Sequence, residues 1–573
     1  MSPAAVDALL VLQRSDVAHL EANRERFAGL PLLCTDPGIL ETVLQAGFTN
    51  YELRRLDTGR DMPARVYTET VARATTIDLL LTREREHLWG PGSFIGWDRG
   101  VLFQPLHVML TAQALRPVVE RDFPEKRLGL LRPDNLLLFN FDSAVQAEIY
   151  GADAQRWSFV DRYPAGRFWN PLQLTACFDF DAIAAIAARG PVPALTHLGS
   201  CFYDVKAFTQ AISEAFASNL DLPSIYCDVP VRRGAMLLKD IATLKPEQID
   251  PSCVLYREAA RRVFTEQLAD LIPSRRTLEA QADVLARRSY LQALNFLGLK
   301  RALAGQRPHL VIADHDNGHL GPLFSLADAL GSEITVFPHS GYTNAALPHA
   351  HRVTAIERDG YGTRVATLLG QAVPTRAVRF RATQPAQHRP ALKRLTILVN
   401  TMYSDGQYQI DLFGLRALFR GLQALCARHG AELAVRLKPS TPAINVVSGA
   451  LGAPADYFLR TTQPSIDDIA RDTDLCIAWG ELTTGSINFL DAASLVVHVS
   501  EEDWPTQLAP QAPFLQERLV RSLHIAQALQ LVQQLFEQPA EYTRLQQLQA
   551  ARYAQRRADA HDTFFPSSPT SPV

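Results

Sequence analysis

The chain has 573 residues, with 57 Lys and Arg against 60 Asp and Glu, a formal net charge of -3. Apolar residues make up 47 % and charged residues 20 %, which is ordinary for a globular protein and excludes a disordered chain. Because nucleic-acid binding needs a basic surface, this balanced charge predicts no nucleic-acid partner. The seven cysteines form no C-x-x-C pair, so we expect reduced thiols in a cytoplasmic protein rather than disulfides or a structural zinc site.

Residues 1–130 are expected to form a mixed α/β N-terminal extension, and they hold no motif that carries chemistry. Apolar positions at helical spacing predict a long helix over residues 65–86, which ends before the Gly-Pro-Gly of residues 90–92. The first residues lack the features of a signal peptide, and no stretch reaches the roughly 18 apolar residues of a membrane span. Peripheral attachment to the inner face of a membrane stays open.

Residues 131–370 show the alternation of a first Rossmann-like domain. Short apolar runs at 136–140, 194–198, 309–313 and 333–337 predict strands, and residues 321–330 predict a helix between the last two. Residues 257–305 carry two helical patterns that break near Pro273. Apolar strands separated by helices imply a parallel sheet with both faces covered.

Residues 371–391 contain three prolines and no periodicity, and they predict an interdomain linker. A second Rossmann-like domain follows over residues 392–557, with strands predicted at 394–401, 432–440, 474–480 and 494–500. An amphipathic helix over residues 411–430 ends at Gly430, a residue typical of helix C-termini. Residues 514–557 predict C-terminal helices, and residues 558–573 a disordered tail.

The predicted fold class is therefore α/β, with two doubly wound Rossmann-like domains facing a cleft. In such sheets ligands bind beyond the carboxyl ends of the strands, so we expect the site in that cleft.

Three polar segments follow predicted strands of the second domain. The strand at 474–480 leads into a loop at which a helix begins. Helix N-termini and hydroxyl groups can donate hydrogen bonds to a phosphate, so the loop is a candidate phosphate site. The alternative is an ordinary N-cap. Two cations at the end of the strand 432–440 favour an anion, with solvated surface charges as the alternative. The loop Tyr-Ser-Asp-Gly at 403–406 could approach a ligand, or form a plain turn. The candidate donor-binding residues are Arg436, Lys438, Ser440, Glu481, Thr483, Thr484, Ser486 and Asp405.

The order of these segments resembles the donor-binding domain of GT-B fold glycosyltransferases, most of all the Kdo- and sialyltransferase-like enzymes that build bacterial surface polysaccharides. The matching elements are Lys438-Pro439, the apolar run 475–478, Thr483-Thr484, Asp491-Ala492 and the apolar run 495–497. The match covers about 110 residues, while residues 131–370 share only the general α/β plan. The resemblance implies that Lys438, Thr483, Thr484 and Ser486 hold the phosphates of a nucleotide-sugar.

Polar loops also follow the predicted strands of the first domain. The segment 313–319 places Asp314, His315 and Asp316 after one strand, and His339 follows the next. An acceptor hydroxyl needs a general base, so we predict Asp316 as that base, His339 beside the donor sugar and Asp314 as an organiser of the loop. Neighbouring residues of a strand end point in opposite directions, so no metal site is predicted. The candidate acceptor-side residues are His197, Asp204 and His315.

The function these features predict is a cytoplasmic glycosyltransferase of hexosyl or Kdo/sialyl type. It would transfer a sugar from a nucleotide-sugar to a glycan, lipid-linked or protein acceptor, without a cofactor. Two alternatives remain: a sugar-nucleotide 2-epimerase-like enzyme, and a non-catalytic nucleotide-binding scaffold.

Overall fold

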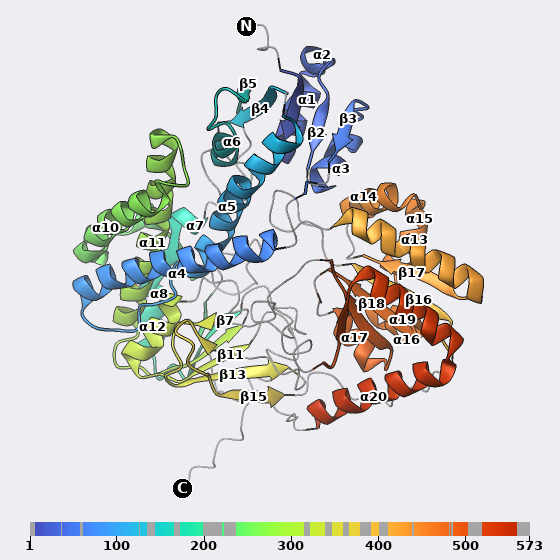
Figure 1. Ribbon diagram of the computed structural model, residues 1–573. Coiled ribbons are helices and arrows are strands. Elements are labelled where there is room, and N and C mark those ends of the chain that lie inside the picture. The colour runs from blue at the N-terminus through green and yellow to red at the C-terminus, as the bar shows by residue number, and fades with distance from the viewer. Residues whose placement is uncertain are drawn as a thin grey trace. The chain divides into compact units, whose positions relative to one another are not determined.

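A computed structural model of the chain divides into two compact units (Figure 1). Unit 1 comprises residues 1–68, 107–167 and 381–558, and unit 2 comprises residues 69–106, 168–380 and 559–573. The structure describes residues 6–35, 37–54, 56–57, 61–124, 126–134, 144–164, 172–198, 220–222, 237–313, 321–337, 346–358, 366–378, 391–399, 411–437, 441–480, 482, 485–501 and 518–558. The expected strand at 136–140 and most of the expected tail at 558–573 lie outside these residues.

The N-terminal part of unit 1 is built on a five-stranded parallel sheet in the order β3-β2-β1-β4-β5. The strands are short apolar runs whose side chains enter one core cluster. Because the last two strands lie at residues 128–163, this sheet extends past residue 130, where the sequence suggested a boundary. The bounds of the strands are β1 Ala8–Val11, β2 Leu32–Cys34, β3 Tyr51–Leu53, β4 Leu128–Pro133 and β5 Trp157–Tyr163.

Helices connect these strands. The long helix expected at 65–86 is α4, which runs over Met62–Trp89 and belongs to unit 2 from residue 69 onward. Helix α1 begins directly after β1, as a doubly wound sheet requires. The remaining helices of this region are α1 Arg14–Ala22, α2 Arg24–Phe27, α3 Pro37–Gln45, α5 Arg99–Asp122 and α6 Ala144–Tyr150.

The second sheet of unit 1 is parallel throughout and has the order β17-β16-β18-β19-β20. Its first four strands match the predicted ones, whereas β20 was not foreseen inside the expected helical segment 514–557. The strands are β16 Arg394–Val399, β17 Glu432–Arg436, β18 Leu475–Trp479, β19 Leu495–Val499 and β20 Arg521–Leu523.

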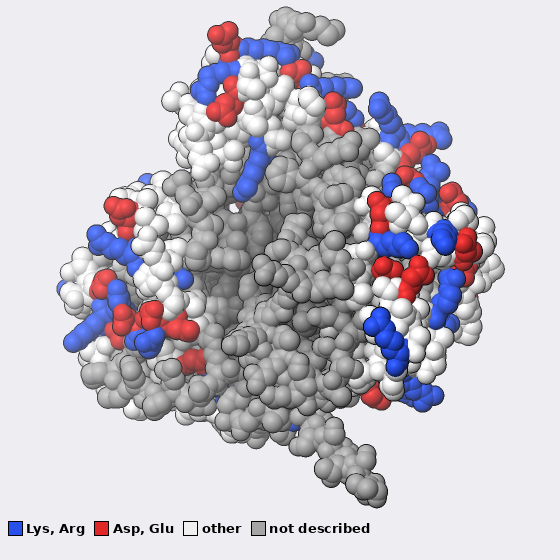
Figure 2. Space-filling view, turned by 180° about the vertical axis from the view of Figure 1, so that it is seen from behind, with Lys and Arg blue, Asp and Glu red and all other residues white. Residues whose placement is uncertain are grey.

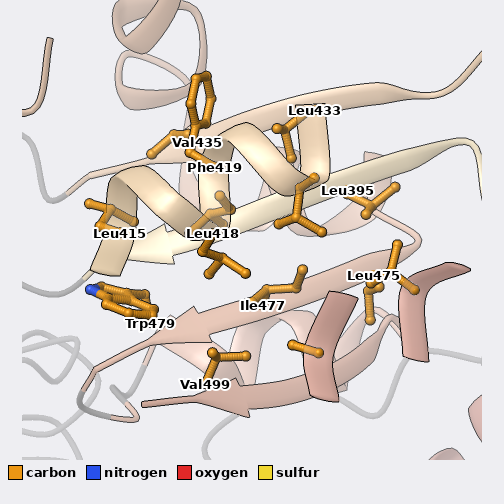
Figure 3. Close-up of a cluster of buried hydrophobic side chains, with 14 of the residues drawn as sticks. Leu395, Leu415, Leu418, Phe419, Leu433, Val435, Leu475, Ile477, Trp479 and Val499 are labelled. Atoms are coloured by element: carbon orange, nitrogen blue, oxygen red, sulfur yellow. The ribbon is translucent and has the colours of Figure 1, made fainter. Parts of the chain in front are cut away.

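Helix α13 (Leu412–His429) covers one face of this sheet, and its apolar stripe explains why. Leu415, Leu418 and Phe419 point from α13 toward the strands, where they meet side chains such as Leu395 and Ile477 (Figure 3). Gly430 ends the helix with a φ of 65°, as its position predicted. The other helices are α14 Thr441–Leu451, α15 Ala455–Thr462, α16 Ile466–Asp472, α17 Gly485–Asp491, α19 Ile525–Glu537 and α20 Pro539–Arg557.

Unit 2 is built on a six-stranded sheet in the order β15-β13-β11-β10-β7-β8, again with parallel neighbours. Its edge strand β15 lies inside residues 371–391, so part of the expected linker belongs to the sheet. A two-stranded antiparallel ribbon, β6 (Ala176–Phe178) with β9 (Leu238–Asp240), accompanies it. The six strands are β7 Ala194–Leu198, β8 Leu220–Leu222, β10 His309–Ala313, β11 Ile334–Phe337, β13 Val353–Arg358 and β15 Thr375–Val378.

The helices described between residues 168 and 380 of this unit are α7 Leu172–Thr175, α8 Phe180–Ala187, α10 Pro251–Leu268, α11 Arg275–Ala302 and α12 Gly321–Leu330. The break predicted near Pro273 separates α10 from α11. A small parallel pair, β12 (Ala346–Leu347) with β14 (Ala366–Thr367), lies in the same unit.

A buried ion cluster ties helices of unit 2 together. Arg85 of α4 is fully buried, forms an ion pair with Asp98 and donates to the hydroxyl of Tyr256 at 2.8 Å. Asp98 also accepts from Ser289 of α11 at 3.0 Å. Asp78 lies 3.7 Å from the same guanidinium, and its burial raises the pKa of its carboxyl group. The guanidinium of Arg85 therefore offsets part of the charge of two buried carboxyl groups.

On the face shown in Figure 2, the acidic and basic side chains of the described residues are intermixed, in keeping with the net charge of -3. Among the described residues, no helix is both long and apolar enough to cross a membrane.

Candidate functional site

The second sheet of unit 1 has a switch point between β16 and β18. From β16 the chain passes to β17 on one side and then crosses to β18 on the other, so the connections diverge there. The strand ends lie level, since Leu398 pairs with Arg436 and Trp479 pairs with both Val399 and Val499. Ligands of doubly wound sheets bind at this position, outside the carboxyl ends.

The polar segments selected from the sequence follow these level strand ends. Residues 400–410 follow β16, residues 438–440 follow β17, and residues 480–486 follow β18. Because the strands end level, all three segments begin at the same edge of this sheet, the one formed by the carboxyl ends of its strands. The candidates Asp405, Lys438, Ser440, Glu481, Thr483 and Thr484 themselves lie outside the described residues, so their roles stay predictions.

Arg436 is described, and the structure gives it a packing role. Its side chain is buried, and Nη1 donates to the carbonyl oxygens of Thr461 and Pro464, the latter at 2.8 Å. Burial lowers the pKa of this guanidinium. These contacts hold the connection between α15 and α16 against β17, and binding of phosphate by Arg436 stays a prediction.

Ser486 is the described candidate with the clearest signal of a ligand. It is the second residue of α17 and is 1 % exposed. Its Oγ has no hydrogen-bond partner among the described residues. Because buried hydroxyl groups are almost always satisfied, an unpartnered one at the switch point suits a ligand oxygen.

Helix α17 is bonded to two neighbouring helices. Asn488 donates to Asp467 of α16 at 2.5 Å. Asp491, its last residue, accepts from Tyr553 and Arg557 of α20, each at 2.7 Å. The middle and the C-terminal end of α17 are therefore held by helices that have no place in the sequence motif.

Sequence reasoning missed His498, which lies on β19 beside the end of β18. Its Nε2 forms a hydrogen bond with the carbonyl oxygen of Gly480, and its Nδ1 lies 2.9 Å from the Oγ of Ser522. Burial lowers the pKa of this imidazole. The sequence signal was a polar residue within the apolar run 495–499. The same signal fits a buried histidine whose hydrogen bonds are made inside the core.

The sheet of unit 2 repeats this arrangement. Its chain passes from β7 to β8 on one side and crosses to β10 on the other, so its switch point lies between β7 and β10. Ala313 pairs with both Leu198 and Phe337, so three adjacent strands end level. The candidates Asp204, Asp314, His315, Asp316 and His339 follow these strands but lie outside the described residues.

His197, a candidate for the acceptor side, lies within β7, where a strand was predicted. It stands opposite Ile312 of β10 and is 6 % exposed. A side chain enclosed in this way is part of the packing of the sheet in the unliganded protein.

The N-terminal sheet of unit 1 has a third switch point, between β1 and β4. There a carboxylate of the protein lies at the helix N-terminus: Asp16 accepts from the amides of Leu12 and Gln13 at 3.0 and 3.1 Å. It also accepts from the hydroxyl of Tyr163 at 2.7 Å. The carboxylate of Asp16 thus occupies the place at the start of α1 where a phosphate would bind. The edge of the N-terminal sheet is therefore a poor phosphate site.

Among the described residues, no three His, Cys, Asp or Glu side chains come together as a metal site would need. Neither a scan against protein-family models nor a search of the curated proteins found a match for this chain.

Proposed function

We propose that this chain is a glycosyltransferase that uses a nucleotide-sugar donor. The main support is that, in both units, the polar segments selected from the sequence follow strands at the switch point of a parallel sheet. Two parallel sheets have the same strand order about a switch point, and the polar segments chosen from the sequence follow the strands on both sides of each one. The resemblance of about 110 residues of the second Rossmann-like domain to GT-B donor domains supports a nucleotide-sugar site at this sheet of unit 1.

In this proposal the edge of the second sheet of unit 1 binds the donor phosphates. Lys438, the hydroxyl groups of Thr483 and Thr484, and Ser486 at the start of α17 offset the negative charge that grows on the leaving nucleotide. The Oγ of Ser486, which is buried and has no partner in the described part of the chain, supports this assignment.

The edge of the unit 2 sheet would supply the acceptor side. Asp316 accepts the proton of the acceptor hydroxyl, whose oxygen forms the new bond to the anomeric carbon while the bond from that carbon to the donor phosphate breaks. The nucleotide leaves with the bonding electrons. His339 contacts the donor sugar or its phosphate, and a glycan, lipid-linked or protein acceptor fits this scheme. Synthesis of bacterial surface polysaccharides is the setting that the resemblance suggests.

A thermal-shift panel of UDP, GDP, CDP, CMP and TDP tests the proposal. A ligand of the native state stabilises it by RT ln(1 + [L]/Kd), about 2.7 kcal/mol at one hundred times Kd. We expect one nucleotide of the panel to raise the melting temperature, and that nucleotide identifies the donor class. No shift with any of the five would contradict the proposal. Binding followed by product formation without an acceptor would favour the epimerase-like alternative, and binding with no turnover of the matching nucleotide-sugar would favour a scaffold.

A further inference from the structure

The outer side of helix α13 carries a row of arginines. One side of this helix packs on the second sheet of unit 1, and the other side is exposed to solvent. Arg416, Arg420 and Arg428 are exposed on that outer side, and Phe413 in the first turn is 40 % exposed. The spacings of three, four and eight positions between these residues place all of them along one face of a helix. We call Arg416, Arg420 and Arg428 the α13 arginines.

The α13 arginines have no acidic partner in the described part of the chain. Residues 412–431 contain no Asp or Glu, and among the described residues no carboxylate forms an ion pair with any of the three arginines. Asp411, just before the helix, accepts from the amide of Gly414 at 2.9 Å. Glu432, which follows the helix, lies 3.2 Å from Arg394. Because exposed like charges in one row repel each other, such a row suits an anionic partner.

Helices α14 and α19, which both contact α13, add almost no charge to this surface. The sequence of α14 has no charged residue, and that of α19 has Glu537 alone, which accepts from Gln533 at 2.8 Å. The exposed side chains between the α13 arginines include the small ones of Ala417, Ala424 and Ala427. A flat anionic surface can therefore approach the guanidinium groups without meeting an acidic side chain of α13.

We propose that the outer side of α13 docks on a lipid bilayer that carries anionic headgroups. The α13 arginines attract the headgroups, and each contributes about a fivefold gain in binding. The ring of Phe413 can enter the interfacial region of the bilayer, where aromatic side chains are favoured. A nucleic acid fits less well, because the row holds three cations and the chain as a whole has a net charge of -3. This inference goes beyond the proposed function and does not depend on it.

Sedimentation with lipid vesicles tests the proposal. One set of vesicles holds phosphatidylglycerol and phosphatidylcholine in equal parts, and the other set holds phosphatidylcholine alone. We expect the protein to sediment with the anionic vesicles and not with the neutral ones. Raising the salt concentration from about 0.1 M to about 1 M shortens the Debye length from about 10 Å to about 3 Å, so binding should be lost at the higher concentration.

A triple variant removes the row itself. It combines Arg416→Gln, Arg420→Gln and Arg428→Gln, and the helix should be kept because glutamine and arginine have similar helix propensities. We expect this variant to bind the anionic vesicles about a hundredfold more weakly than the parent protein. Each single variant should bind about fivefold more weakly, so the test does not depend on the folding of the triple variant.

A matched control separates the row on α13 from the net charge of the chain. It combines Arg275→Gln, Arg471→Gln and Arg544→Gln, which removes the same charge from exposed arginines that each pair with a carboxylate of their own helix or of its first turn. Its binding to the anionic vesicles should stay within about threefold of that of the parent protein, because paired surface charges attract a distant anion weakly.

Three results would overturn the proposal: no binding to the anionic vesicles, equal binding to the neutral ones, or equal losses in the two triple variants. Binding of a DNA duplex in place of the vesicles would also overturn it and would make the row a nucleic-acid surface. No nucleotide enters this experiment, so its failure would leave the thermal-shift test of the proposed function unaffected.

Discussion

Replacing Ser486 by alanine should have a different effect from replacing an ordinary helix cap. Loss of a cap lowers stability and leaves ligand affinity unchanged, whereas Ser486→Ala should keep or raise stability and lower ligand affinity. The hydroxyl is buried at 1 % exposure without a partner among the described residues, so the unliganded protein gains no hydrogen bond from it. Removing a buried unsatisfied group relieves a desolvation cost of about 1–3 kcal/mol. We therefore expect Ser486→Ala to unfold at the same or a higher urea concentration.

The same change should weaken nucleotide binding. A hydrogen bond to a charged phosphate contributes about 1.5–3 kcal/mol, which is roughly a 10- to 150-fold increase in Kd. Affinity for the corresponding nucleoside, which lacks phosphate, should stay the same. Urea denaturation and calorimetric titration of one protein preparation give both quantities.

Ser494 provides a matched control in the same sheet. It is a buried serine just before β19, and its Oγ donates to the carbonyl oxygen of Thr473 at 2.6 Å. Ser494→Ala should therefore lose about 1 kcal/mol of stability and keep its nucleotide affinity. If Ser486→Ala behaves in this way instead, its hydroxyl is structural and the reasoning from the unpartnered oxygen is refuted.

Four other outcomes are expected. Lys438→Ala should weaken nucleotide binding by about 1.5–3 kcal/mol with little change in stability, and unaltered affinity in a titration would discard its phosphate contact. Asp316→Asn should lower turnover by about two to four orders of magnitude and keep nucleotide affinity within about twofold. If Asp316→Asn were fully active while His339→Ala were inactive and still bound the donor, His339 would be the general base instead of Asp316. Transferase activity should be unchanged in EDTA. Activity that EDTA abolished and magnesium restored would instead indicate a metal site at residues 314–316. Arg85→Met should cost about 3–5 kcal/mol in urea denaturation because it leaves Asp78 and Asp98 buried without their cation, whereas a change under 1 kcal/mol would show that the cluster is not held by charge.

Much of the secondary structure could be predicted because its causes are local. An apolar stripe at helical spacing and the terminal Gly430 define α13, and apolar runs define β10, β16 and β18. The N-terminal sheet was harder to predict. Its strand β1 has four residues, and Ala8 pairs with Leu128, so nothing near residue 8 in the sequence indicates its partner. The edge strands β15 and β20 were missed for a similar reason, since they are short and owe their conformation to a neighbouring strand.

The sequence by itself selected the candidate site residues, because polar groups directly after apolar strands are visible as a pattern. It also determined that the strands are parallel, since helices separate them. Only the tertiary structure decided which strand ends lie level, where each sheet has its switch point, and that Arg436 and His197 are packed inside their sheets. Strand order and the partners of a buried side chain depend on contacts between residues far apart in the chain, and no local pattern encodes them. His498 shows this most directly: the residue stands in the sequence as one polar letter in an apolar run, and its bond to Gly480 exists only because β18 and β19 are neighbours.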